Sequence, residues 1–493
     1  MAIQGGLRFA PMGRPLLFFL LLLSGTIVGQ DSLRTHFGPL PTLPDTGSTL
    51  SFMVSPGELG VSHTTDGSRS TWMGGLQAGV RIHHSRWDLD AQWETVRGPG
   101  TFYRRAMESG WDRRTASGLG ASRWRGRWTW SPLQSVDVII GRDTLSEGWG
   151  VRSLFRGRHA APAPFAQFAV DGGGRLRYRH RVEALQGSPH IDCWTGAVGD
   201  PRTWVPPVGR LRSGIERMLV SHRVEVDFGT RLTGALWGGV VWNVEDGRRA
   251  FEPHYLLPLT SLRPTEYAQG SSDNALVGLE GRIKLGSDWA RRPRTLYGQF
   301  LLDELIVSEL LGGTQWWGNK FALLGGIRWD TEWGGWRWEV SAARPWTYSH
   351  YTSTAAYVHG NTPLAHPLGA NFVETLWQGD WQSDTWKVHA RFTASVRGDD
   401  PTGDTPTGSL PQVGDIRRTE DTYAWLNGRH RWRTVAFLDV GRTVKLAPDI
   451  PVQAFVQAAW GRETHPLDGL APGREVWIGF GLRGSGPFLG ADW

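Results

Sequence analysis

The chain has 493 residues, a formal net charge of +6 and one cysteine, Cys193. A single cysteine excludes a disulfide framework and a cysteine-rich zinc site. The mean hydropathy of −0.33 and the charged fraction of 20% exclude a bundle of membrane-spanning helices and a highly charged disordered chain. Glycine and tryptophan are abundant, at 65 and 28 residues, so the composition favours a fold rich in turns and aromatic side chains.

The N-terminus carries an export signal. Arg8 and Arg14 precede the apolar run 15–23, and small or polar residues follow at 24–26. A basic region, a short apolar run and small residues are typical of a secretory signal peptide. The run is shorter than the roughly 20 residues of a spanning helix. We therefore predict a signal peptide over residues 1–30, and nucleic acid is not an expected partner of the exported protein.

The rest of the chain follows a period of two. Residues 31–70 form a segment rich in Gly, Pro, Ser and Thr, and alternation dominates beyond it. In 218–228, Val220, Val224 and Val226 share one face of an extended strand, while Arg223 and Glu225 share the other. Successive strand side chains point to opposite faces, so this strand has one apolar face and one charged face.

Similar segments recur along the chain and predict about sixteen to eighteen strands. They lie near 76–84, 86–97, 121–131, 135–143, 176–183, 218–228, 232–244, 275–285, 295–304, 320–330, 335–343, 371–379, 386–397, 433–444, 452–460 and 476–482, with weaker patterns at 50–61 and 420–432.

Three features favour a membrane barrel over a secreted β-sandwich. Tryptophans are frequent at the strand ends, as in interfacial aromatic girdles. The strands are long enough to cross hydrocarbon at a tilt. The chain also ends on an aromatic residue, Trp493. We predict an all-β fold, in which residues 71–493 form an antiparallel outer-membrane β-barrel of a bacterium, with the charged faces turned into a largely filled lumen.

One run departs from the period of two. The second half of 301–313 has helical spacing and ends on Gly312 and Gly313. It predicts a short helix, either a plug at one mouth of the barrel or a cap on a long loop.

Several motifs, in order, resemble the capsule assembly protein Wzi family and related gliding-associated outer-membrane proteins. The residues that carry the resemblance are Arg142, Asp143, Trp149, Asp273, Asn274, His359, Asn361, His366 and Asn371. The resemblance implies a barrel of eighteen strands, occluded by loops or short helices, that binds or anchors capsular or surface polysaccharide without catalysis. It implies surface polysaccharide and outer-membrane lipid as partners, together with other cell-surface export or motility proteins.

Carbohydrate is held by aromatic faces and planar polar groups, which gives a set of candidate binding residues. Trp316 and Trp317 are consecutive, and Trp333 and Trp336 flank a Gly-Gly turn. The alternative role for these tryptophans is that of a membrane-interface girdle. Alternation over 295–304 turns three further candidates into the lumen, where they either line a glycan path or brace a plug: Tyr297, Gln299 and Asp303.

No cofactor or metal site is predicted. His350, His359 and His366 match no compact metal-binding spacing. No nucleophile elbow, metalloprotease motif or phosphate loop is present, so we predict a protein that is not an enzyme. Two alternatives to polysaccharide binding stay open, which are an outer-membrane pore and a structural or adhesion component of surface motility.

Overall fold

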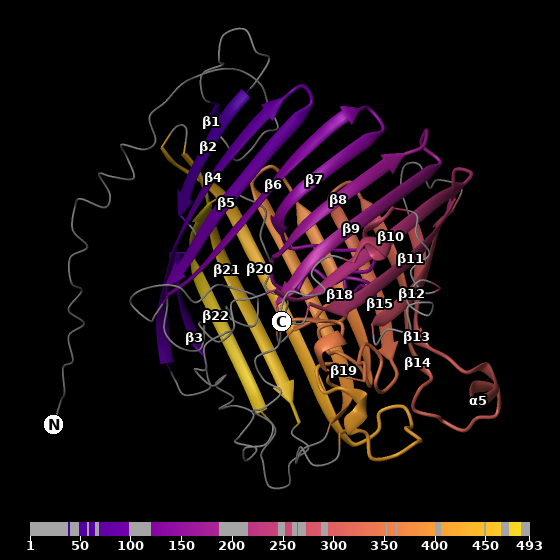
Figure 1. Ribbon diagram of the computed structural model, residues 1–493. Coiled ribbons are helices and arrows are strands. Elements are labelled where there is room, and N and C mark those ends of the chain that lie inside the picture. The colour runs from indigo at the N-terminus through magenta and orange to yellow at the C-terminus, as the bar shows by residue number, and fades with distance from the viewer. Residues whose placement is uncertain are drawn as a thin grey trace, which may run out of the picture.

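The computed structural model is almost entirely an antiparallel sheet (Figure 1). It describes residues 38–39, 49–56, 59–64, 69–97, 120–186, 215–244, 252–258, 264, 273–286, 294–351, 353–360, 362–399, 406–447, 450–464 and 473–484. The strands of the main sheet are β1 (Gly38–Pro39), β2 (Thr49–Pro56), β3 (Leu59–Thr64), β4 (Arg69–His84), β5 (Trp87–Arg97), β6 (Gly120–Leu133), β7 (Val136–Asp143), β8 (Ala163–Asp171), β9 (Leu176–Gln186), β10 (Ile215–Phe228), β11 (Leu232–Asn243), β12 (Asn274–Leu285), β13 (Arg294–Glu304), β14 (Lys320–Thr331), β15 (Gly334–Ala343), β18 (Phe372–Gln382), β19 (Trp386–Asp399), β20 (Arg429–Ala447), β21 (Ile450–Glu463) and β22 (Gly473–Gly484).

The sheet closes on itself. Each strand from β4 onward pairs with the next, and β22 pairs with β3, so the yellow end of the wall lies beside the indigo start in Figure 1. β2 and β3 both pair with β4 and are successive halves of one wall position. The sheet has twenty strands among the described residues. If β2 and β3 are counted as one position and the two-residue β1 is left out, eighteen positions remain around the ring.

The two ends of the barrel differ in the length of their connections. Links of two or three residues join β4 to β5, β6 to β7, β10 to β11, β14 to β15 and β18 to β19. The links at the other end include 144–162, 244–273 and 344–371. We call these the turn end and the loop end. In outer-membrane barrels the short turns face the periplasm and the longer loops face outward.

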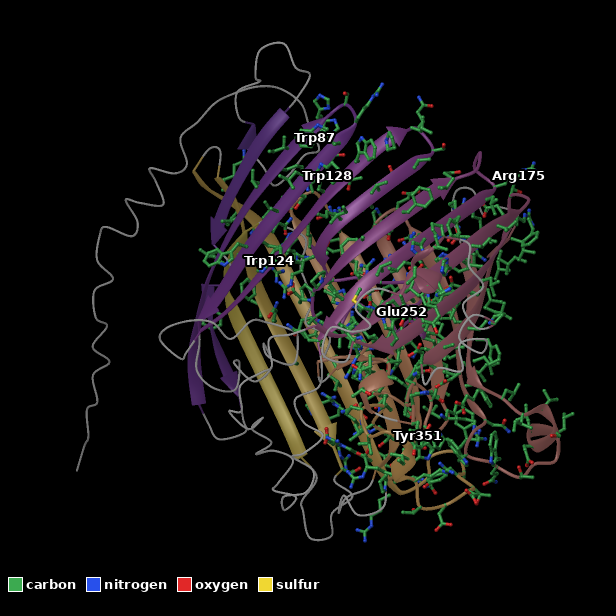
Figure 2. The ribbon with its side chains drawn as sticks, viewed as in Figure 1. Trp87, Trp124, Trp128, Arg175, Glu252 and Tyr351 are labelled. Atoms are coloured by element: carbon green, nitrogen blue, oxygen red, sulfur yellow. The ribbon has the colours of Figure 1, made fainter. Side chains whose placement is uncertain are left out.

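The outer wall is apolar and rich in tryptophan. Large apolar side chains are exposed around the ring, among them Leu236, Leu279 and Phe480. Trp124 and Trp128 on β6 are exposed as well, and Figure 2 shows them along the wall together with Trp87. A closed sheet leaves no unpaired backbone edge, which the bilayer interior requires. The chain is therefore an outer-membrane antiparallel β-barrel, as the sequence predicted.

The predicted strands match the ring with three differences. The weak pattern at 420–432 was wrong, because the chain forms a strand only from Arg429 onward. β8 was missed. The barrel wall also begins before residue 71, since β2 and β3 lie in the segment expected to precede it. The predicted signal peptide, residues 1–30, lies outside the described residues.

β8 was missed because both of its faces are apolar over much of its length. Phe165 points inward, where it is buried, and Phe168 points toward the outer wall. Pro162 precedes the strand and Pro164 is its second residue. Because proline is unusual inside a strand, these residues weaken the prediction of a strand further. The period of two therefore disappears where the lumen side of a strand packs against protein rather than water.

The short helices lie in the loops. These are α3 (Pro253–Leu256), α5 (Val307–Leu311), η4 (Ser353–Ala355) and η5 (Asp415–Arg417), and β16 (Val358–His359) pairs with β17 (Thr362–Pro363). The helix predicted in 301–313 is α5, but it does not plug a mouth, because none of its residues is buried and it projects from the barrel in Figure 1. Among the described residues, no helix has the length and apolarity to cross a bilayer.

One loop covers part of the outer wall. α3 belongs to the connection between β11 and β12, and its Tyr255 is fully buried against Trp242 with ring centroids 5.3 Å apart. Val220 and Val240 on the outer face complete this cluster. Figure 2 shows the neighbouring Glu252 in front of the strands. Near the loop end of β10 and β11, protein therefore replaces lipid on the outer wall.

Candidate functional site

The lumen is filled on one side by two segments, 144–162 and 344–371, which we call the plug. Phe155 and Tyr357 of the plug are fully buried, and both contact Trp237 on the inner face of β11. The ring centroids of Phe155 and Trp237 lie 5.3 Å apart and those of Trp237 and Tyr357 lie 6.3 Å apart. Leu301 on β13 belongs to the same cluster. The barrel thus encloses a hydrophobic core inside its lumen.

Wall side chains hold the main chain of the plug. Glu280 on β12 accepts a hydrogen bond from the backbone N–H of Trp149 at 2.7 Å. Glu339 on β15 accepts from the N–H groups of Val151 at 2.7 Å and Arg152 at 3.1 Å. Because these bonds go to backbone atoms, they fix the path of the plug whatever side chains it carries.

A buried ionic cluster joins the plug to β9 and β10. Glu147 of the plug accepts from Arg179 at 2.9 Å and lies 3.3 Å from Arg181 and 3.5 Å from Arg223. Burial alone would raise the pKa of the Glu147 carboxyl, but the three guanidinium groups hold this pKa below its usual range. Arg223 also donates to Glu280. The carboxylate is therefore ionised, and it ties the plug to the wall.

The predicted lumenal residues Tyr297, Gln299 and Asp303 do face inward. The Tyr297 hydroxyl donates to Glu339 at 2.5 Å. The side-chain oxygen of Gln299 accepts from the N–H of Leu154 at 2.9 Å, and Asp303 accepts from the N–H of Tyr348 at 2.8 Å. All three side chains are buried. Their hydrogen bonds to the plug fit the second of the two roles considered for them, which is to brace it.

The consecutive tryptophans lie at the loop end. The rings of Trp316 and Trp317 are 5.6 Å apart, and Trp317 lies 3.9 Å from the Arg418 guanidinium and 4.8 Å from the Lys320 ammonium. Trp316 forms a β-bridge with Thr422. Both rings are partly exposed. Lys320 is fully buried and paired with Asp415 at 2.6 Å, whereas the Arg418 side chain is 31% exposed. The two tryptophans and Arg418 form a loop-end platform.

Trp333 and Trp336 lie at the opposite end of the barrel. Trp333 occupies the two-residue turn between β14 and β15 and is 69% exposed, while Trp336 is exposed on the outer wall. Since β14 spans the whole wall between Trp317 and Trp333, the four tryptophans do not form one site. The positions of Trp333 and Trp336 fit the interfacial girdle that was the alternative role for them.

Of the residues that carried the family resemblance, Arg142, Asp143 and Trp149 lie at the start of the first plug segment or just before it. Asp143 caps the start of the plug by accepting from the N–H of Thr144 at 2.7 Å. The Trp149 ring lies 4.4 Å from the Arg282 guanidinium and 5.4 Å from that of Arg223. Arg142 instead points outward and lies over the exposed ring of Trp124 at 4.9 Å.

The other described resemblance residues hold the loop between β11 and β12 and the second plug segment in place. Asp273 accepts from the Tyr255 hydroxyl at 3.0 Å, and Asn274 is buried beside it in the chain. Nδ1 of His359 faces the N–H of Gln186 at 3.1 Å, Nε2 of His366 lies 3.1 Å from Glu374, and Nδ2 of Asn371 donates to the carbonyl of Asn427 at 2.8 Å. Asn361 lies outside the described residues. Within the described ranges, no group of three His, Cys, Asp or Glu side chains is placed to hold a metal.

The opposite side of the lumen is lined by charged side chains that remain exposed. The sequence did not show which of the inward-facing charges would be exposed and which would be buried. In the packed sector, formed by β8–β15 and β18, the ion pairs Arg156–Glu183, Arg181–Glu147 and Arg152–Glu374 have side chains at most 6% exposed. In what we call the open sector, formed by β4–β7 with β20 and β21, the pairs Arg81–Asp90, Arg125–Asp143 and Arg433–Glu463 have side chains 18–49% exposed. Within this sector, Asp439 on β20 is a buried exception, since it pairs with Arg483 of β22 and both side chains are at most 7% exposed.

Guanidinium groups also dominate the turn end of the packed sector. Arg177 and Arg282 are 33% exposed and Arg179 is 39% exposed. Their acidic partners Glu225, Asp227 and Glu147 are 13%, 22% and 3% exposed. The arginines are thus more exposed to the lumen than the carboxylates that pair with them, so the surface beneath the plug is positive. The sequence showed these alternating charges but not which of them remain exposed.

Comparisons with known proteins find only distant similarities. No protein-family model matches the chain, and no curated protein matches it. Solved structures that resemble it include a BenF-like porin from Pseudomonas fluorescens Pf-5 (8% identity, 90% of this chain and 99% of that chain, TM-score 0.48). Others are OccAB2 of Acinetobacter baumannii (6%, 89% and 97%, 0.47) and OprD of Pseudomonas aeruginosa (10%, 88% and 94%, 0.45).

Proposed function

We propose that the protein is an outer-membrane channel of restricted bore, which passes small polar solutes along the open sector. The observation that carries this proposal is the exposure of the charged pairs on β4–β7, β20 and β21, at 18–49%, inside a barrel whose other side is packed. Side chains such as Arg81 and Arg433 stay hydrated there, and a hydrated wall of mixed charge suits polar solutes rather than apolar ones.

The channel prefers anions under this proposal. Arg177, Arg179 and Arg282 are 33–39% exposed at the turn end, whereas the carboxylates that pair with them are only 3–22% exposed. A lumen lined by one sign of charge raises the local concentration of the opposite ion. Chloride and small organic anions are therefore expected to pass more readily than potassium.

Single-channel recording in planar bilayers tests the proposal. We expect small, stable currents, with a reversal potential in a potassium chloride gradient that favours chloride. Arg433→Glu reverses a charge inside the open sector and is expected to shift that potential toward cation preference. Arg462→Glu, whose side chain points outward from the neighbouring strand position, is the matched control and should leave the potential unchanged. A purified protein that folds but never conducts would rule the channel out.

A second candidate function, attachment of surface polysaccharide, is favoured by the loop-end platform alone. This function would agree with the resemblance to the Wzi family. The Arg418 guanidinium lies 3.9 Å from the ring of Trp317, and Trp316 and Trp317 are both partly exposed. Aromatic faces stack on sugar rings, and guanidinium groups suit acidic sugars.

Binding of the purified protein to surface polysaccharide from the producing bacterium tests this second function. Trp316→Ala together with Trp317→Ala should abolish binding, whereas Trp333→Ala at the turn end should not affect it. If the unaltered protein does not bind, the glycan function fails and the channel proposal is untouched.

A further inference from the structure

α5 exposes an apolar surface that neither proposed function uses. Ile306, Val307, Leu310 and Leu311 are all exposed, and Leu311 is exposed to 83%. The helix lies two residues beyond the end of β13 and projects sideways from the lower right of the barrel in Figure 1. An exposed cluster of large aliphatic side chains is costly in water, so this surface calls for an apolar partner.

The exposed residues lie on one side of the helix. At about 100° per residue, Ile306, Leu310, Val307 and Leu311 fall within an arc of about 140°. Ser308 and Glu309 occupy the opposite side. The Glu309 carboxylate accepts a hydrogen bond from the Thr314 hydroxyl at 2.8 Å, so it is turned back toward its own loop. The apolar arc therefore carries no charge.

The root of this loop is fixed at the rim of the barrel. The side-chain oxygen of the buried Asn319 accepts from the N–H of Ile306 at 2.8 Å. Below the root, the outer wall is lipid-facing, with Leu296 on β13 and Leu323 on β14 exposed. The rings of Phe300 and Phe321 lie 6.2 Å apart, Phe300 opposite Leu323 and Phe321 nearer the loop end. The loop that carries the apolar arc thus starts at the edge of the apolar outer wall.

We propose that α5 is a lateral membrane anchor, whose apolar arc inserts among the acyl chains of the outer leaflet beside β13 and β14. Short amphipathic helices bind at this depth when their apolar side chains enter the acyl boundary and their polar side faces water. α5 has this division, with its hydroxyl and carboxylate on the side opposite the aliphatic cluster. It contains no lysine or arginine, so the acyl chains rather than phosphate groups are its contact.

Spin-label accessibility tests the anchor. Cys193, the single cysteine, is replaced by serine, and a nitroxide is attached through Leu311→Cys on the apolar arc or Ser308→Cys on the polar side. The full-length protein is reconstituted in vesicles of phosphatidylcholine and phosphatidylglycerol. Collision with oxygen, which concentrates in lipid, is compared with collision with a water-soluble nickel chelate.

The anchor predicts opposite results at the two positions. The label at 311 should favour oxygen and the label at 308 should favour the nickel chelate. If 311 collides with nickel as readily as 308, the helix lies in water and the proposal fails. If 311 is shielded from both reagents, protein covers it, and the proposal fails as well. Val307→Cys reports from the same arc if the Leu311 variant does not assemble.

Discussion

The packed and open sectors of the lumen show how the same alternating strand pattern gives two different interiors. On β9 and β10 the inward charges meet the plug and become buried pairs, such as Arg156 with Glu183. On β4 and β5 the inward charges meet no described segment of the plug, and Arg81 and Asp90 remain exposed. What fills the space opposite a strand, rather than the strand itself, decides whether its polar face is structural or faces water.

The difference sets where stability and permeability reside. Buried ion pairs and a hydrophobic core make the packed sector intolerant of change. Exposed pairs contribute little to stability, so the open sector can vary its charges to set ion preference. Three changes test this contrast, beginning with the largest effect.

Glu183→Gln should destabilise the barrel strongly. It leaves the Arg156 guanidinium, whose Nε lies 3.1 Å from Glu183, buried without that carboxylate, and breaking a buried pair costs about 3–5 kcal/mol. Asp90→Asn breaks an exposed pair and should cost about 1 kcal/mol or less. Urea unfolding of both variants measures the two free energies of unfolding. Equal losses would contradict the division into sectors.

Acid should weaken the packed sector through His359. Burial, reinforced by Arg156, Arg217 and Arg142, lowers the pKa of His359 from 6.5 to about 3. The unfolded chain binds a proton below pH 6.5, and the folded protein does not until the pH approaches 3. Stability is therefore complete above pH 6.5 and falls as the pH drops toward 3, by about 1.4 kcal/mol per unit.

His359→Gln provides the control for this pH dependence. The amide can still accept from Gln186 and donate to Pro162, as the imidazole does, but it does not titrate. Unfolding curves between pH 7 and pH 4 should be flatter for the variant than for the unaltered protein. If the free energy of unfolding depends on pH equally in both proteins, His359 is not the cause of the acid sensitivity.

Gly278→Ala should cause a smaller loss. A Cβ at Gly278 would lie 2.3 Å from the ring of Phe155 in the plug, and forcing such a ring to move costs about 1–3 kcal/mol. Gly281 lies on the same strand with nothing within 4 Å of its added Cβ. Gly281→Ala should leave the free energy of unfolding nearly unchanged. The loss at 278 should vanish in a Phe155→Ala background if the plug is its cause.

The wall could be predicted from the sequence because lipid imposes a repeating rule on each strand. Val220, Val224 and Val226 alternate with Arg223 and Glu225 whatever the rest of the chain does. The rule fails at β8, where Phe165 packs inward on protein. It also could not separate strand from loop at 420–432, because alternation over a few residues occurs by chance in an irregular segment.

The plug could not be predicted in the same way. Phe155 and Tyr357 lie in segments without regular period, and only their contact with Trp237 explains their burial. The inward direction of Tyr297, Gln299 and Asp303 followed from alternation, but their partners are backbone atoms of residues distant in the sequence. Trp333 and Trp336 were grouped with Trp316 and Trp317 by composition, which carries no information on which end of a strand a residue occupies.

Cysteine accessibility during current recording tests the unequal filling of the lumen most directly. In a background without Cys193, Arg433→Cys and Gln299→Cys are each exposed to a charged methanethiosulfonate reagent while current is measured. If only the open sector of the lumen contains water, the reagent should change the current abruptly when the cysteine is at 433 and should not change it when the cysteine is at 299. Equal modification of both, or a folded barrel that carries no current, would contradict it.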